Sequence, residues 1–198
     1  MTTLVVPYRG SDPKRRLEPL SRGDRVELAE AMLADVLAAA TAVGRVFVVA
    51  PDAVSLPEDV THVLDPRRGQ GAAVRAALDA ASAEGTAAPY LVVNADLPCA
   101  TARDLLALAG AIPEHGLAIA AAADGTTNAL GLADQNVFEP LYGPGSAERF
   151  AGLAESRLVA APNLVDDVDT LDDLARLAAR LGPSTTRAVI ARRIREAA

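Results

Sequence analysis

Short runs of consecutive apolar residues alternate along this chain with longer segments of helical periodicity, and this alternation restricts the fold more than any other feature. Runs such as Val46–Ala50 and Tyr90–Val93 are apolar at every position, which indicates strands buried on both faces. Helical spacing is clearest between Ala29 and Ala40. Buried strands separated by helices predict an α/β fold, with a mostly parallel sheet and helices on both of its faces.

The pattern also places the individual elements. The expected strands are Leu4–Pro7, Val46–Ala50, Val60–Leu64, Tyr90–Asn94, Leu117–Ala122 and Leu130–Ala133. The expected helices include Ala29–Ala40, Ala72–Ala83, Ala102–Ala109 and Ala147–Ala154, with two more closing the chain.

Composition limits the domain count and the classes of partner. With 198 residues, 51% of them hydrophobic, residues 1–198 are expected to form a single domain. A net charge of -7 and an aromatic content of 3% argue against broad binding to nucleic acid or to anionic lipid. The single cysteine, the lack of a membrane-length apolar run and the absence of a signal-like start predict a cytoplasmic protein.

A cationic segment follows the first expected strand. Four cations lie within the eight residues from Arg9 to Arg16, and Lys14 is the only lysine of the chain. In an α/β sheet this position borders the ligand crevice, so a phosphorylated ligand is one interpretation. A solvated turn is the other, and the segment alone does not decide between them.

Three carboxylates form a candidate metal site. Asp96 follows a buried strand, where it either holds Mg²⁺ or accepts hydrogen bonds in an Asx turn. Thr170 fits a helix N-cap with Asp173 as its capping-box partner, which gives Asp173 a structural role. Asp167 and Asp169 precede that cap and point to one side of an extended segment, so a cation between them would relieve their repulsion.

Three glycine-containing segments are weaker candidates for ligand contacts. Residues 124–130 form either a polar ligand loop or a hairpin turn. Ser146, after Gly143, is expected to be an N-cap, with or without an anion at the helix N-terminus. Gly71 lies in a glycine-rich turn that enters a helix, which is a weak signal for nucleotide binding.

Taken in order, the motifs resemble the 2-phospho-L-lactate guanylyltransferase family of coenzyme F-420 biosynthesis. They are Pro7-Tyr8-Arg9, the cationic segment as far as Leu17, Asn94-Ala95-Asp96-Leu97-Pro98, Gly125 to Leu130, Gly143-Pro144-Gly145-Ser146 and Asp167-Val168-Asp169. The resemblance implies a Rossmann-like nucleotidyltransferase fold. It also implies transfer of a guanylyl group from GTP to a phosphorylated three-carbon acid, with release of pyrophosphate.

The resemblance assigns roles residue by residue. Lys14 and Arg16 are the implied triphosphate contacts, and the glycine-rich turn adds Gly71 as a candidate for the nucleotide site. The implied Mg²⁺ ligands are Asp96, Asp167 and Asp169, and the implied acid contacts are Thr127, Gly143 and Ser146. The chain departs from the family pattern at Arg15, Ala72 and Phe150.

The acceptor and the partners follow from the same resemblance. The Pro7-Tyr8-Arg9 opening is similar to archaeal members and favours 2-phospho-L-lactate over phosphoenolpyruvate or 3-phosphoglycerate. A homodimer and a downstream lactyl transferase are the implied partners. A sugar-phosphate or molybdopterin nucleotidyltransferase is the alternative enzyme, and a nucleotide-sensing protein without turnover is the alternative class.

Overall fold

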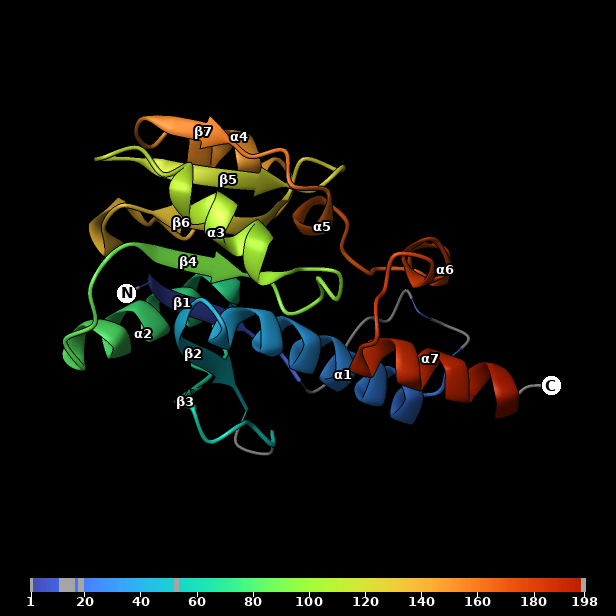
Figure 1. Ribbon diagram of the computed structural model, residues 1–198. Coiled ribbons are helices and arrows are strands. Elements are labelled where there is room, and N and C mark those ends of the chain that lie inside the picture. Colours follow the sequence, from blue (N-terminus) through green and yellow to red (C-terminus); the bar gives the residue numbers. More distant parts are fainter. Residues whose placement is uncertain (1, 11–16, 18–19, 52–53, 197–198) are drawn as a thin grey trace.

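The fold is built on a seven-stranded sheet in the order β3-β2-β1-β4-β6-β5-β7, shown in Figure 1. The computed structural model describes residues 2–10, 17, 20–51 and 54–196. The strands are β1 (Thr2–Pro7), β2 (Gly44–Ala50), β3 (Val60–Leu64), β4 (Tyr90–Val93), β5 (Leu117–Ala121), β6 (Thr127–Leu132) and β7 (Ser156–Leu158).

The strand directions confirm the predicted mostly parallel sheet. Strands β3, β2, β1 and β4 run parallel to one another, and β7 runs parallel to β5. Only β6, among the described strands, is antiparallel to both of its neighbours. The connection from β5 to β6 is a tight turn through Gly125 (φ +81°), and a turn this short joins only antiparallel strands.

Helices cover both faces of the sheet, as predicted. On one face lie α1 (Arg22–Thr41) and α3 (Ala102–Gly110), and on the other lie α2 (Gln70–Ala83) and α4 (Ser146–Ala151). Alternate residues of β1 show why a strand here must be apolar throughout. The side chains of Leu4 and Val6 join the core between the sheet and helices α1 and α3, here called the first core. The side chain of Val5 joins the core between the sheet and helices α2 and α4, here called the second core.

The C-terminal part returns to the face covered by α1 and α3. It comprises helices α5 (Pro162–Val165), α6 (Leu171–Ala178) and α7 (Thr185–Glu196), whereas the 3-10 turn η2 (Gln135–Val137) precedes α4 and packs on the opposite face with α2. Helix α7 lies alongside α1 in Figure 1. The Asp35 carboxylate on α1 accepts hydrogen bonds from the backbone N–H groups of Thr185 (2.8 Å) and Thr186 (2.9 Å) and so caps α7.

Neither β7 nor α5 was expected from the sequence. Strand β7 is only three residues long and lacks an apolar run, and α5 is a single turn that begins at Pro162. In the described part of the chain, no helix has the length and apolar character needed to span a membrane. The parallel strands β3, β2, β1 and β4 all end at the same edge of the sheet, which is where a fold of this kind binds ligands.

Candidate active site

A cavity of about 710 Å³ opens at the carboxyl ends of the parallel strands. Its walls come from the segments that follow β1, β2, β3 and β4 and from the facing sides of α1 and α2. The lining residues are Pro7, Tyr8, Arg9, Gly10, Ala29, Met32, Val49, Pro51, Asp65, Arg67, Gly69, Gln70, Ala73, Asn94, Ala95 and Asp96. The cavity combines apolar walls with a few polar groups, the usual composition of a small-molecule site.

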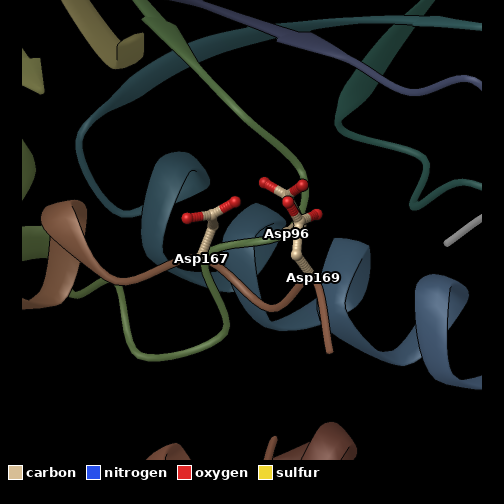
Figure 2. A group of neighbouring side chains, drawn as sticks. All are labelled: Asp96, Asp167 and Asp169. Carbon is tan, nitrogen blue, oxygen red and sulfur yellow. The ribbon is translucent and has the colours of Figure 1, made fainter. Parts of the chain in front are cut away.

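Asp96, Asp167 and Asp169 meet beside this cavity, as the sequence predicted. One carboxylate oxygen from each lies within 4.8 Å of the others, and all three residues are half-buried. Figure 2 shows Asp96 reaching the group from the segment after β4, while the other two come from the segment before α6. Residues about 70 positions apart in sequence therefore form one negatively charged group.

The backbone between α5 and α6 explains the direction of the two later carboxylates. Val168 lies between them, is fully buried, and packs into the first core. Its N–H donates a hydrogen bond of 3.2 Å to the carbonyl of Asp96. Because alternate side chains of an extended segment point in opposite directions, burial of Val168 turns Asp167 and Asp169 toward the cavity side.

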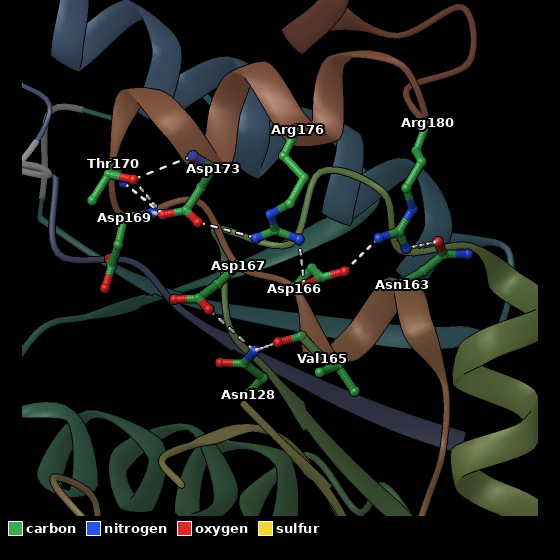
Figure 3. A network of polar contacts seen from close by, with 10 residues as sticks. All are labelled: Asn128, Asn163, Val165, Asp166, Asp167, Asp169, Thr170, Asp173, Arg176 and Arg180. Carbon is green, nitrogen blue, oxygen red and sulfur yellow. Dashed lines mark hydrogen bonds and ion pairs between the residues drawn. The ribbon is translucent and has the colours of Figure 1, made fainter. Parts of the chain in front are cut away.

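Helix α6 holds this segment in place through a polar network, shown in Figure 3. The Asp166 carboxylate accepts hydrogen bonds from Arg176 (2.6 Å) and from Arg180. The capping box predicted at Thr170 and Asp173 is confirmed, and Asp173 also accepts from the Asp169 N–H at 3.2 Å. The network therefore fixes the residues on both sides of Asp167.

Charge in this network also affects ionisation. Burial would raise the pKa of Asp166, but the hydrogen bonds and charges of Arg180 and Arg176 outweigh that effect and lower the pKa. Burial would also raise the pKa of Asp173, but hydrogen bonds from Thr170 and Arg176 outweigh that effect and lower the pKa. Both carboxylates are thus held as anions that anchor α6 to the candidate site.

Three amide side chains near the site stand in the sequence only as members of longer motifs, without a predicted role of their own. The Asn128 Nδ2 atom donates to the Val165 carbonyl (2.9 Å) and to Asp167 Oδ1 (3.5 Å). The Asn94 Nδ2 atom donates to the Thr127 carbonyl (3.2 Å), and Asn94 Oδ1 accepts from Gln70 Nε2 (2.7 Å). The signal that could have found Asn94 and Asn128 is a polar residue at the end of an otherwise apolar strand.

The predicted acid contacts Thr127, Gly143 and Ser146 come together at the β5–β6 turn. The Thr127 and Ser146 hydroxyls lie 3.0 Å apart in a hydrogen bond. The Ser146 N–H donates to the Gly143 carbonyl at 3.0 Å. The next N–H, of Ala147, donates to the Gly125 carbonyl at 3.2 Å and ties this loop to the hairpin.

One local expectation here was wrong. Ser146 is not the N-cap of α4, because Gly145 takes that position with φ +69° and leaves Ser146 buried inside the first turn. For residues 124–130 the hairpin-turn alternative is confirmed, since this segment joins antiparallel β5 and β6 and β6 already begins at Thr127. A left-handed residue is easiest for glycine, so the second glycine of the loop takes the cap.

Gly71, which was predicted to contact the nucleotide, is not among the residues that line the cavity. A Cβ atom on Gly71 would lie 2.4 Å from the Cβ of Pro140, so Gly71 lets α2 pack against the segment before α4. The residues of α2 and its cap that line the cavity are Gly69, Gln70 and Ala73. Lys14, Arg15 and Arg16 lie outside the described residues.

Phe150, one of the departures from the family pattern, has a packing role. It is fully buried in the second core and stacks on Phe138, with ring centroids 6.2 Å apart. Tyr142 meets it edge-on at 5.2 Å. These aromatic contacts support the loop that carries Gly143 and Ser146.

The carboxylate group fits a magnesium ion by its donor chemistry. Mg²⁺ binds oxygen ligands, commonly one or two carboxylates together with phosphate oxygens of a substrate. Three aspartates with oxygens within 4.8 Å of one another supply that donor set at the edge of the cavity. Like charges held this close favour a bound cation.

Comparison with known sequences places the chain in a family. A family model described as "Guanylyl transferase CofC like" matches residues 2–176. A phosphoenolpyruvate guanylyltransferase from Sphaerobacter thermophilus is 37% identical over 198 residues, covering 90% of this chain and 93% of the relative. A 2-phospho-L-lactate guanylyltransferase from Natrialba magadii is 37% identical over 148 residues, covering 64% and 60% respectively.

Solved structures show the same fold at lower sequence identity. A putative nucleotide-diphospho-sugar transferase from Desulfovibrio desulfuricans has a TM-score of 0.77 and 17% identity, covering 96% of this chain and 94% of that one. A 2-C-methyl-D-erythritol 4-phosphate cytidylyltransferase from Thermus thermophilus has a TM-score of 0.60 and 15% identity, covering 87% and 95%. The fold, the family match and the full-length relatives agree, and the chain belongs to the CofC-type guanylyltransferase family.

Proposed function

We propose that this enzyme transfers the guanylyl group of GTP to phosphoenolpyruvate, with Mg²⁺ held by Asp96, Asp167 and Asp169. The observation that carries the proposal is the meeting of these three carboxylates at the edge of a cavity large enough for a nucleotide. A nucleotide-sensing protein would have no need of such a group at the end of its ligand cavity. The alternative without turnover is therefore the weaker one.

The reaction requires little covalent chemistry from the protein. An oxygen of the acceptor phosphate forms a bond to the α-phosphorus of GTP, and the bond from that phosphorus to the bridging oxygen breaks. Pyrophosphate leaves with the electron pair. Because a phosphate monoester is already largely dianionic near neutral pH, no histidine base or cysteine nucleophile is needed.

The protein's task is to bring anions together and hold them in line. When bound, Mg²⁺ would supply positive charge to the phosphate oxygens. Asn128 orients Asp167 by its hydrogen bond of 3.5 Å, and the α6 network fixes the backbone on either side. Asp96 is placed by the end of β4 and by the bond from Val168 to its carbonyl.

The cationic segment completes the nucleotide site in this proposal. Arg9 and Gly10 line the cavity, and the chain continues directly from them to Lys14 and Arg16. These two cations are assigned to the triphosphate and to the charge on the departing pyrophosphate. Their position in sequence, next to two lining residues, supports that assignment.

The acid is assigned to the turn that carries Thr127, Gly143 and Ser146. The two hydroxyls bond to each other and both residues are buried, so they hold the turn in shape, whereas the half-buried Gly143 lies where an acid can reach the turn. The Asn94 amide links this turn to the nucleotide cavity through the Thr127 carbonyl. The acid phosphate would then face the metal site from the β6 side.

Phosphoenolpyruvate is preferred as acceptor because relatives bearing that name align over nearly the whole chain. The Sphaerobacter thermophilus relative covers 90% of it and a Streptomyces scabiei relative, 35% identical, covers 94%. The second candidate is 2-phospho-L-lactate, which the Pro7-Tyr8-Arg9 opening favours. A role in coenzyme F-420 biosynthesis, a downstream lactyl transferase and a homodimer remain predictions from the family.

The test follows pyrophosphate release from GTP with phosphoenolpyruvate, 2-phospho-L-lactate and 3-phosphoglycerate in turn, with and without Mg²⁺. We expect Mg²⁺-dependent release with phosphoenolpyruvate at the highest kcat/KM. Faster turnover of 2-phospho-L-lactate would establish the second candidate. No release with any of the three acids would contradict guanylyl transfer to a three-carbon acid.

A further inference from the structure

The cavity has a second carboxylate, Asp65, far from the metal site. Among the described lining residues, Asp65 and Asp96 are the carboxylates. Asp65 directly follows β3 and Asp96 follows β4, with β2 and β1 between them. Adjacent strands lie about 4.8 Å apart, so three spacings separate the ends of β3 and β4 by about 14 Å. A nucleotide that lies across these strand ends would have its phosphates near one of the two carboxylates and its base near the other.

The direction of the nucleotide rests on the proposed function. If the α-phosphate meets the metal ligands near Asp96, the base extends toward β3. Between the two ends the cavity is lined by Val49, Pro51 and Ala73, which are apolar surfaces suited to a flat aromatic ring. Asp65 then lies where the edge of the base arrives.

The backbone fixes the Asp65 carboxylate in this position. The Asp65 N–H donates to the Ala50 carbonyl at 3.1 Å, which extends the β2–β3 ladder by one residue. The Arg67 N–H donates to Asp65 Oδ1 at 2.8 Å, in a turn where Arg67 has φ +56°. Among the described residues this is the one hydrogen bond that the Asp65 side chain accepts. Because a carboxylate has about four lone-pair sites, Asp65 can accept further hydrogen bonds from a ligand.

We propose that Asp65 selects guanine by accepting hydrogen bonds from its N1–H and its N2 amino group. An ionised carboxylate only accepts hydrogen bonds, and guanine presents two adjacent donors on this edge. Adenine has a ring-nitrogen acceptor in place of N1–H and carries no amino group at C2, so it would leave the carboxylate unpaired. A site built on such a bond rejects ligands that lack the donor.

The experiment measures equilibrium binding of GTP, inosine triphosphate and ATP in the presence of Mg²⁺, without an acid, so that no turnover is required. Wild-type protein is expected to bind GTP most tightly, then inosine triphosphate, which lacks the amino group, and then ATP. Asp65→Asn keeps the shape and an oxygen for the Arg67 N–H, but it replaces one acceptor with a donor. We expect GTP binding to weaken about 10- to 100-fold and ATP binding to stay unchanged.

The matched control is Asp59→Asn, which removes the same charge from an exposed residue at the opposite end of β3. It should leave all three affinities unchanged. A preference for GTP that persists in Asp65→Asn would overturn this inference while leaving the proposed function intact. Wild-type protein that binds no nucleoside triphosphate would overturn both.

Discussion

The three aspartates of the proposed metal site differ in what positions them. Asp96 depends on the end of a buried strand, whereas Asp167 and Asp169 depend on a short extended segment anchored by buried Val168. A substitution that removes one charge and keeps the side-chain volume therefore tests metal binding without disturbing the core.

Asp169→Asn is expected to remove most of the rise in Tm that Mg²⁺ gives the wild-type protein. A ligand that binds the folded state raises its stability, and loss of one of three carboxylates weakens that binding. Thermal unfolding in EDTA and in Mg²⁺ measures the effect. Asp172→Asn, an exposed carboxylate in the first turn of α6, is the control. Equal Mg²⁺ shifts in wild-type and Asp169→Asn protein would exclude Asp169 as a ligand.

The tyrosines give a prediction about alkaline pH. Burial, with a smaller effect from the charge of Glu30, raises the pKa of Tyr8 to about 12, and burial also raises the pKa values of Tyr90 and Tyr142. The unfolded chain loses these protons first, near pH 10, so the free energy of unfolding must fall as pH rises from about 10 to about 12. For Tyr8 alone the loss is at most about 3 kcal/mol.

Tyrosinate absorbance of the folded protein against pH measures these ionisations, and chemical denaturation at pH 9 and pH 11 measures the stability. Tyr8→Phe should show a smaller fall in stability between the two pH values. Ionisation of all the tyrosines near pH 10 in the folded protein would contradict the burial of their hydroxyls.

At the scale of elements, α6 supports the segment that carries two of the three aspartates of the proposed metal site. Its first turn caps itself through Thr170 and Asp173, and Arg176 on the helix and Arg180 just beyond it bind the Asp166 carboxylate. The helix thus orients Asp167 and Asp169, which precede it in the chain.

Arg180→Gln is expected to weaken Mg²⁺ binding about tenfold, by analogy with the loss of other groups that orient metal ligands. Because the ion pair between Arg180 and Asp166 is partly exposed, its loss should lower the free energy of unfolding by no more than about 1 kcal/mol. Mg²⁺ titration of activity and of Tm would separate the two effects. Arg157→Gln on β7 is the control for the lost charge, and Arg180→Lys should restore part of the affinity. An unchanged Mg²⁺ dependence would show that the network serves stability alone.

The start of α2 depends on close packing. Gly71→Ala would place a Cβ atom 2.4 Å from Pro140 Cβ and 2.9 Å from its Cα. Because the backbone of Pro140 must move, we expect a loss of about 1–3 kcal/mol in the free energy of unfolding. Gly110→Ala, at the end of α3 with no atom within 4 Å of the added Cβ, is the control and should be neutral or stabilising. Equal stability of the two variants would contradict the contact.

At the scale of the whole molecule, the sequence predicted the position of an element wherever every residue of that element is buried. Strand β4 and residues 46–50 of β2 lie between two helical layers and must be apolar throughout, so their positions were predicted correctly. Strand β7 pairs only with β5 at the sheet edge and is mostly exposed, so no apolar pattern marks it. Elements with few buried residues leave little trace in sequence.

The same distinction applies to the candidate site. The aspartates could be brought together from sequence, because a strand end and a helix cap each fix where a side chain lies. The hydrogen bond from Asn94 to Thr127 depends on the register between β4 and β6, and those of Asn128 depend on where the segment around Val165 lies; a single sequence specifies neither. The cap of α4 depends on which of two glycines takes the capping position, and the expectation for Ser146 failed for that reason.

The most direct test of the central claim follows the phosphorus atoms of GTP. With GTP labelled at the α-phosphate, phosphoenolpyruvate and Mg²⁺, the label should move into a guanosine diphosphate-linked acid, whereas label in the γ-phosphate should appear in pyrophosphate. Asp169→Asn should abolish both transfers while remaining folded, and Asp172→Asn should retain them. Label that stays in GTP with every acid, or a fully active Asp169→Asn variant, would contradict guanylyl transfer at the site formed by Asp96, Asp167 and Asp169.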